Sequence, residues 1–289
     1  MARRAAPRPA RRRRAQAQSM ISELFHVGPI AISPFGVAMM VAFVAAYFQL
    51  RHAMGVNRAG DPEDAGALVF WGGLVGIAGA KVYYALLYHD WRLLFERYGL
   101  VWYGGFLAAT ATLLWVVRRR RLPLAATADA LAVALALGYG IGRIGCFLVG
   151  DDYGRPTELP WGVAFPRGLP PTTAGALRSQ FGVEVPPAIA DDALLRVHPT
   201  QLYETAAALA IWWFGRRLLR GGAPAGRPAL AVLALLAAER FAVELVRAKD
   251  DRFFGPLSLA QVISLTILAV VAALWLRLRR RRAAAEAPA

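Results

Sequence analysis

Three ionisable side chains stand out inside long apolar segments of the chain, where a charge is costly. They are Lys81, Arg143 and Arg240. Because a charged group at membrane depth needs a partner or a water-filled cavity, each is a candidate for a functional site. We expect Arg143 and Arg240 at a similar depth, where two guanidinium groups can together hold a phosphate. The alternative is that each arginine pairs with a carboxylate, such as Glu204 or Glu244, for structural reasons alone.

Glycines surround Arg143. Gly140, Gly142 and Gly145 form a G-x-G-x-x-G pattern, and Gly154 follows shortly afterwards. The pattern does not indicate a dinucleotide site, because it lies within an apolar segment and lacks the strand–turn–helix context that such a site needs. We interpret these glycines as positions where a neighbouring helix or a lipid headgroup approaches the backbone closely.

A second polar cluster, His198-Pro-Thr-Gln-Leu-Tyr-Glu204, begins a later apolar segment. Pro199 suits the first turn of a helix, which predicts His198 as its N-cap. Gln201 and Glu204 are three residues apart and therefore share a face. The helix dipole favours a glutamate near a helix start, which gives Glu204 a structural explanation beside a catalytic one. For His198 both a structural and a catalytic role stay open.

Trp102-Tyr-Gly-Gly105 lies at one end of another apolar segment. Tyr103 is either a residue of the interfacial aromatic belt or a donor of a hydrogen bond or proton into the site. Cys146 is the only cysteine, which excludes an internal disulfide and CxxC-type zinc sites. We interpret it as a small buried apolar residue and predict no metal site.

The composition indicates a membrane protein. Hydrophobic residues make up 57% and charged residues only 18% of the 289 residues, which is too little charge to cover a soluble chain. Apolar segments long enough for membrane helices number seven, the fifth being short. They lie near 29–50, 65–88, 99–117, 124–149, 203–215, 228–246 and 255–276. We predict an all-α integral membrane protein with seven transmembrane helices.

The arginines predict its orientation. Four basic clusters fall in loops on one side, which the positive-inside rule assigns to the cytoplasm. They are Arg51 and Arg58; Arg118 to Arg121; Arg216, Arg217, Arg220 and Arg227; and Arg277 with Arg279 to Arg282. The N-terminus is then outside and the C-terminus cytoplasmic. Topology accounts for the net charge of +15, so no nucleic-acid partner is expected.

The segments divide the chain into five parts. Residues 1–19 are either a basic disordered tail or precede a true start at Met20, which we favour. The other parts are transmembrane helices one to four in 20–149, a small outward-facing, periplasmic head in 150–198, helices five to seven in 199–278, and a cytoplasmic tail in 279–289. The head is rich in Pro and Gly and too small for an independent domain.

The motifs, taken in order, resemble the prolipoprotein diacylglyceryl transferase family. They are Gly142-Arg-Ile-Gly145, Gly150 to Gly154, His198 to Glu204, and Arg240-Phe-Ala-Val-Glu244-Leu-Val-Arg247. The resemblance runs from about Met20 to the end of the seventh segment. It implies a seven-span enzyme of the bacterial inner membrane. Such an enzyme moves the diacylglyceryl group of phosphatidylglycerol to the lipobox cysteine of a preprolipoprotein, forming a thioether and releasing glycerol phosphate without a metal or organic cofactor.

The resemblance also implies site residues. Arg143 and Arg240 match the family's two essential arginines, and His198, Glu204 and Tyr103 are candidates for the base that deprotonates the thiol. The expected substrate-binding residues are Gly104, Gly105, Gly142, Gly145, Gly154, Gln201, Tyr203, Glu244 and Arg247.

Several positions depart from the family pattern. Tyr103 replaces a histidine, Cys146 an asparagine and Asp151 a glutamate. These changes leave a second hypothesis, a divergent paralogue that binds phospholipid through the arginines but uses another acceptor or does not turn over. A transporter for an anionic solute is less favoured, because the sequence shows no internal repeat.

Overall fold

The computed structural model describes residues 24–27, 30–95, 101–249 and 252–286. The predicted basic tail 1–19 and the proposed start at Met20 lie outside these residues.

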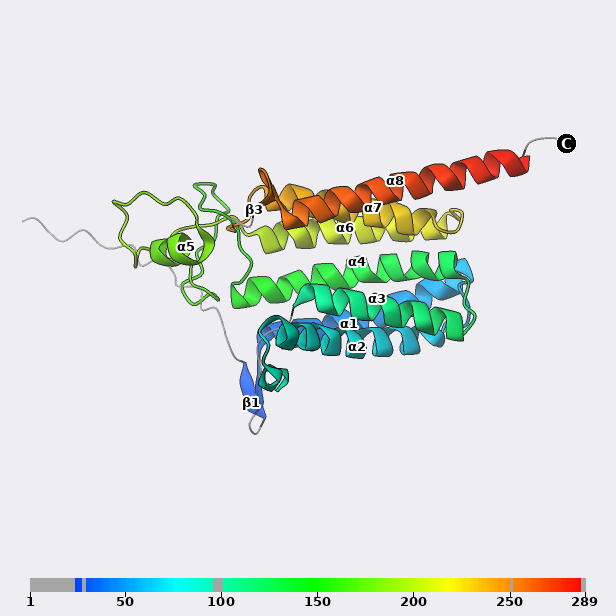
Figure 1. The fold of residues 1–289 in the computed structure, drawn as a ribbon, viewed down its shortest axis with the longest axis horizontal. Helices are drawn as coiled ribbons and strands as arrows, with labels where there is room; N and C mark the ends of the chain where they lie inside the picture. Colours follow the sequence, from blue (N-terminus) through cyan, green and yellow to red (C-terminus); the bar gives the residue numbers. More distant parts are fainter. Residues whose placement is uncertain (1–23, 28–29, 96–100, 250–251, 287–289) are drawn as a thin grey trace, which may run out of the picture.

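The described chain is predominantly helical (Figure 1). Its seven long helices are α1 Pro34–Asn57, α2 Asp64–Leu87, α3 Trp102–Arg119, α4 Leu124–Val149, α6 Thr200–Arg220, α7 Arg227–Glu244 and α8 Leu259–Glu286. The short elements are the 3-10 helix η1 Trp91–Leu94, helix α5 Ala174–Phe181 and the strands β1 Phe25–Val27, β2 Ile30–Ile32, β3 Arg252–Phe254 and β4 Leu257–Ser258. Each of the seven predicted segments overlaps one long helix. Four of them, α1, α2, α4 and α8, are long and apolar enough to cross a membrane.

Local signals set the ends of these helices. Ser33 caps α1 by accepting a hydrogen bond from the Gly36 amide at 3.1 Å, and Pro34 occupies the first turn. Helix α4 follows Pro123 and ends at Gly150, whose φ of 71° is favourable only for a residue without a Cβ.

Helix α4 is the centre of the bundle. It packs against α1, α6 and α7, while α2 packs against α1 and α3 packs mainly against α2 (Figure 1). Small residues permit the close approaches: a Cβ added at Gly145 would lie 2.8 Å from Ala38 Cβ of α1. The outward faces of the long helices carry exposed apolar side chains, including Met40, Val44 and Phe48 of α1. These faces fit a lipid environment, and the chain is a membrane protein.

Residues 150–198, the head, lie beyond one end of the bundle (Figure 1). We call this the head end; the helix ends and loops that carry the four arginine clusters lie at the opposite end. The head has a small apolar core of its own. Ala248, which lies beyond the end of α7, also packs into this core. This core comprises Tyr153, Phe165, Ala174, Leu177, Val185, Val197 and Ala248.

The structure corrects several predicted boundaries. The fold is helical, as predicted, and two antiparallel pairs of short strands, β1–β2 and β3–β4, accompany the helices. Strand β2 occupies residues predicted as the start of the first span, and α1 begins after it at Pro34. Helix α6 is longer than predicted. Helix α8 continues to Glu286 through the predicted tail, because arginine and alanine are good helix formers.

Candidate functional site

A continuous chain of ion pairs and hydrogen bonds crosses the head end of the bundle. It joins helices α4, α6 and α7 to the first residues of the head. Its members, in order of contact, are Tyr139, Glu204, Arg143, Asp152, Arg247, Glu244 and Arg240. We call this chain the arginine–carboxylate network.

Arg143 connects three elements of the structure. Its Nη2 forms an ion pair with Oε2 of Glu204 on α6, and its Nη1 lies 3.0 Å from Oδ2 of Asp152 in the head. Tyr139, one turn earlier on α4, donates a hydrogen bond to Oε1 of Glu204 at 2.9 Å. The Arg143 side chain is 11% exposed and that of Glu204 is 2% exposed, so both charges are held away from solvent.

Arg240 belongs to the same network through α7. Its Nη1 lies 2.6 Å from Oε2 of Glu244, one turn later, and Nη1 of Arg247 lies 3.7 Å from the same oxygen. Nη2 of Arg247 lies 2.6 Å from Oδ1 of Asp152. The carboxylate pairing that the sequence analysis gave as the alternative is therefore present, with Glu204 for Arg143 and Glu244 for Arg240, and Asp152 links the two pairs through Arg247.

The network keeps hydrogen-bond donors that the described residues do not use. Nε of Arg143 and Nε of Arg247 are buried and form no hydrogen bond or ion pair with a described residue, whereas Nη2 of Arg143 and Nη1 of Arg240 lie against Glu204 and Glu244 in ion pairs. A buried N–H without an acceptor is costly. Phosphate oxygens are suitable acceptors, so pairing with carboxylates does not exclude an anionic ligand.

Glu239 is a site residue that the sequence analysis missed. It precedes Arg240 on α7, both of its carboxylate oxygens are buried, and neither accepts a hydrogen bond from a described residue. It lies within electrostatic range of Glu204, Arg240 and Arg143. The rule that singled out Arg240, an ionisable residue within an apolar segment, would have identified Glu239 as well.

The head is fixed to α6 beside the network. Gln201 donates from Nε2 to the backbone oxygen of Asp151 at 2.5 Å, and Thr200 donates from Oγ1 to that of Asp152 at 2.7 Å. The Gly154 amide donates to the His198 oxygen at 2.8 Å. A Cβ at Gly154 would lie 2.6 Å from both His198 Cβ and the Val246 oxygen, which explains the glycine by packing.

Two adjacent acids of the head have opposite electrostatic environments. Burial, reinforced by the charge of Asp152, raises the pKa of Asp151 to about 6. Burial also acts to raise the pKa of Asp152, but Arg247 and Arg143 outweigh it and hold that pKa below its usual value. Asp152 is therefore ionised at neutral pH and suited to bridge the arginines.

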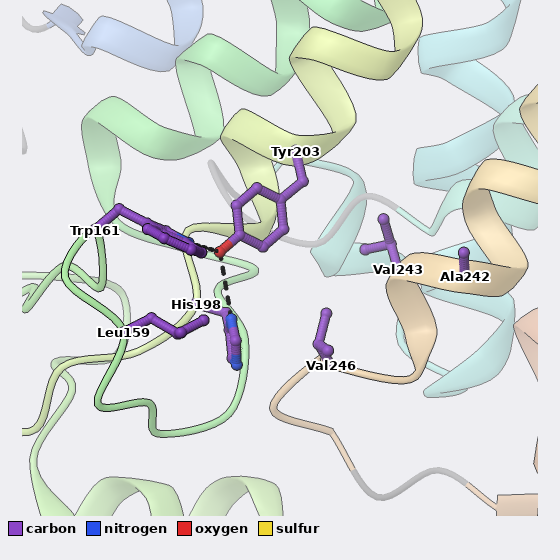
Figure 2. A pocket seen from close by; sticks show the side chains of 7 residues that line it. All are labelled: Leu159, Trp161, His198, Tyr203, Ala242, Val243 and Val246. Atoms are coloured by element: carbon purple, nitrogen blue, oxygen red, sulfur yellow. Dashed lines mark hydrogen bonds between the residues drawn. The ribbon is translucent and has the colours of Figure 1, made fainter.

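His198 does not cap α6 as predicted. Pro199 occupies the cap position and the helix begins at Thr200. The hydroxyl of Thr200 donates a hydrogen bond to the backbone oxygen of Asp152 in the head. Burial lowers the pKa of His198, so its ring is neutral at neutral pH. Its Nδ1 lies 3.3 Å from the hydroxyl of Tyr203, beside a pocket between the head, α6 and α7 (Figure 2).

The remaining predicted residues lie on α2, α3 and α4. Tyr103 is half-buried at the start of α3, and its catalytic role stays a prediction. Gly104 and Gly105 pack on α2: a Cβ at Gly104 would lie 2.5 Å from the Gly79 oxygen. Gly142 is different, because a Cβ there would lie no closer than 3.6 Å to Met39 Sδ. Lys81 is half-buried on α2.

One group of side chains has the spacing of metal ligands. Ligand atoms of Cys146, Asp151 and Asp152 lie within 4.8 Å of one another. Asp152 already pairs with Arg143 and Arg247, however, and a cation would meet these two positive charges. The geometry therefore suits an anion beside the arginines better than a metal ion.

Fold and site together define a helical membrane protein with a partly buried arginine–carboxylate network at one end of its bundle. The family model for prolipoprotein diacylglyceryl transferase matches residues 22–277. The chain belongs to this family.

Curated relatives agree with the family. The chain is 29% identical over 267 residues to a phosphatidylglycerol–prolipoprotein diacylglyceryl transferase of Vibrio cholerae, an alignment covering 87% of this chain and 90% of the relative. It is 29% identical to the Shewanella oneidensis enzyme of the same name, covering 82% of this chain and 85% of the relative. The Vibrio atlanticus enzyme of that name is 28% identical and covers 87% and 89%.

Proposed function

We propose that this protein is a membrane enzyme that moves the diacylglyceryl group of phosphatidylglycerol onto the lipobox cysteine of a preprolipoprotein. Relatives that carry the name of this activity align with most of the chain. They favour it over the divergent lipid-binding protein considered from the sequence. The structural observation that supports it best is that Arg143 and Arg240 lie in one partly buried network, in which the buried Nε of Arg143 has no hydrogen-bond partner among the described residues.

The reaction requires stabilisation of a phosphate leaving group. The thiol sulfur forms a bond to the terminal glyceryl carbon, the bond from that carbon to the phosphate oxygen breaks, and glycerol phosphate leaves. Negative charge grows on the phosphate as that bond breaks. Arg143 and Arg240 are proposed to bind it, because cations held in place beforehand stabilise such charge strongly.

The thiol must lose its proton before or during attack. His198, Glu204 and Tyr103 are proposed for this step from the sequence, and the structure adds Glu239. Glu204 is already engaged by Arg143 and Tyr139, whereas the oxygens of Glu239 accept no hydrogen bond from a described residue. We therefore propose Glu239 as the first proton acceptor to test.

The substrates are proposed to contact residues around the network. This set comprises Gly104, Gly105, Gly142, Gly145, Gly154, Gln201, Tyr203, Glu244 and Arg247. Of these, Gly142 is the glycine whose small size the packing explains least, so backbone contact with the lipid headgroup is the proposed reason for it.

The membrane arrangement belongs to the same proposal. All seven long helices cross the inner membrane, the head faces the periplasm, the N-terminus is outside and the C-terminus is cytoplasmic. Supporting it, the loops with the four arginine clusters gather at the end of the bundle opposite the head (Figure 1).

The experiment is a turnover assay with phosphatidylglycerol vesicles and a lipobox peptide. Glycerol phosphate release should fall by at least about 100-fold in Arg143→Ala and in Arg240→Ala, the loss expected for removing a charge-stabilising donor. Arg217→Ala is the matched control, because Arg217 is an exposed arginine near the other end of α6. Wild-type rates from both site variants, folded in detergent, would refute the proposal.

A further inference from the structure

A pocket lies beside the arginine–carboxylate network, between the head and two helices (Figure 2). Its volume is about 450 Å³, within the range of small ligand sites. Leu159 and Trp161 form the wall contributed by the head. Ala242 and Val243 of α7, with Val246 just beyond that helix, form the opposite wall.

The pocket presents almost only apolar surface. Its polar side chains satisfy one another: Trp161 donates from Nε1 to the Tyr203 hydroxyl at 2.7 Å, and Nδ1 of His198 lies 3.3 Å from the same oxygen. Figure 2 shows these three side chains meeting along one side of the hollow. The lining includes no Lys, Arg, Asp or Glu. A ligand group that enters should therefore be apolar and uncharged.

The pocket and the network share the same helical turns. Tyr203 precedes Glu204 on α6, and Val243 precedes Glu244 on α7. Successive residues of a helix point about 100° apart, because a turn contains 3.6 residues. One face of each turn therefore lines the pocket while the adjacent face carries a carboxylate of the network. A molecule in the pocket therefore lies beside the turns that carry Glu204 and Glu244, the carboxylate partners of Arg143 and Arg240.

The location favours a polypeptide over a lipid tail. Acyl chains run from the headgroup toward the middle of a membrane, along the helices and away from the head. The pocket has one wall in the head and the other at the last turn of α7, so it lies where a chain leaves the membrane at the head end. Large apolar side chains stand at this boundary in exposed positions, Trp161 at 55% and Leu159 at 37% exposure.

Resting on the proposed function, we propose that this pocket binds the apolar side chains immediately preceding the acceptor cysteine in the polypeptide substrate. A secretory signal segment consists of an apolar stretch followed by small residues. Seated here, the apolar residues fix the register of the segment, and the cysteine that follows the small residues is held beside the network. Trp161 and Tyr203 supply the aromatic wall that receives them.

Two variants and two substrate titrations test the site. Trp161→Ala removes one wall, and Ala242→Phe fills the hollow from a position that is exposed in the free protein. We expect the KM for the lipobox peptide to rise about tenfold in each, which is about 1.4 kcal/mol of binding. The KM for phosphatidylglycerol and the kcat at saturating peptide should stay within about twofold. Trp115→Ala, an exposed tryptophan of α3, is the control.

A binding readout separates this inference from the proposed function. A lipobox peptide with a benzophenone side chain two residues before its cysteine should cross-link to residues 159–161 or 242–246, identified by mass spectrometry, whether or not turnover occurs. Cross-linking without any peptide modification would keep the pocket and overturn the proposed reaction. A raised KM for phosphatidylglycerol with an unchanged peptide KM would assign the pocket to the lipid and overturn the inference. Unchanged values for both substrates, or cross-links elsewhere, would also overturn it.

Discussion

Nη1 of Arg143 lies 3.0 Å from Oδ2 of Asp152, so an arginine of the central helix is tied to the first residues of the head. The other carboxylate oxygen of Asp152 lies 2.6 Å from Nη2 of Arg247, beyond the end of α7. The Asp152 side chain of the head thus contacts both α4, through Arg143, and the residues that follow α7, through Arg247. Any ligand phosphate that binds Arg143 shares this guanidinium with two carboxylates, which couples binding to the position of the head.

The first prediction concerns this bridge. Asp152→Asn removes the charge that holds Arg143 and Arg247 together, so the arginines lose their fixed positions. We expect turnover to fall by about 100-fold, the size of loss that a displacement of about 1 Å can cause at a catalytic site. The assay is the release of glycerol phosphate from phosphatidylglycerol.

Asp191→Asn is the matched control, since Asp191 is an exposed acid of the head that pairs with Arg178 away from the network. Exposed ion pairs contribute little to stability, so this variant should behave as wild type. Equal rates for Asp152→Asn and Asp191→Asn would show that the bridge does not position the arginines.

The second prediction concerns Glu239. If its free carboxylate accepts the thiol proton, Glu239→Gln should lower kcat by about 100-fold or more, as expected for loss of a general base. Glu239→Asp, which keeps the acid on a shorter side chain, should restore part of the rate. Glu63→Gln at the opposite end of the bundle serves as control. A kcat for Glu239→Gln within about threefold of wild type would remove Glu239 from the reaction.

The third prediction is a pH dependence of stability. The pKa of Asp151 is raised from 3.8 to about 6 in the folded protein, so the fold favours the protonated acid. The contribution of protonated Asp151 to the free energy of unfolding is full below pH 3.8, and it is lost as the pH rises through about 6. The Asp151→Asn variant has no carboxyl group to titrate at this position. Its thermal midpoint in detergent should therefore decline less than that of wild type across this window; parallel curves would contradict the assignment.

The fourth prediction separates two glycines by thermal stability. Gly154→Ala places a methyl group 2.6 Å from His198 Cβ and from the Val246 oxygen, and neither backbone can move freely. We expect a loss of about 1–3 kcal/mol, the usual cost of overpacking. Gly142→Ala, with its nearest neighbour at 3.6 Å, should unfold close to the wild-type midpoint. Equal midpoints would show that the head can shift at Gly154.

Much of this architecture could be predicted from the sequence. The apolar segments locate the long helices, and the cost of a charge in such a segment singles out Arg143 and Arg240. The same reasoning named Glu204 and Glu244 as possible partners, and both pair with these arginines. These features are predictable because they depend on burial along one segment at a time.

Other features depend on which segments meet. Asp152 is one of several acids in a polar stretch, and nothing in its neighbours marks it as the link between two arginines. Strands of three residues, such as β1 and β2, are too short for an alternating pattern to identify. The shift of the α6 cap from His198 to Pro199 follows from a contact between Thr200 and the head, far apart in sequence.

The most direct test of the proposed function is the mass of a lipobox peptide after incubation with the purified protein and phosphatidylglycerol. We predict that the peptide gains one diacylglyceryl group on its cysteine while one glycerol phosphate is released. Neither product should form with Arg143→Ala. Glycerol phosphate without a modified peptide would mean another acceptor. An unmodified peptide and intact lipid, from folded protein that binds both substrates, would contradict the proposed reaction.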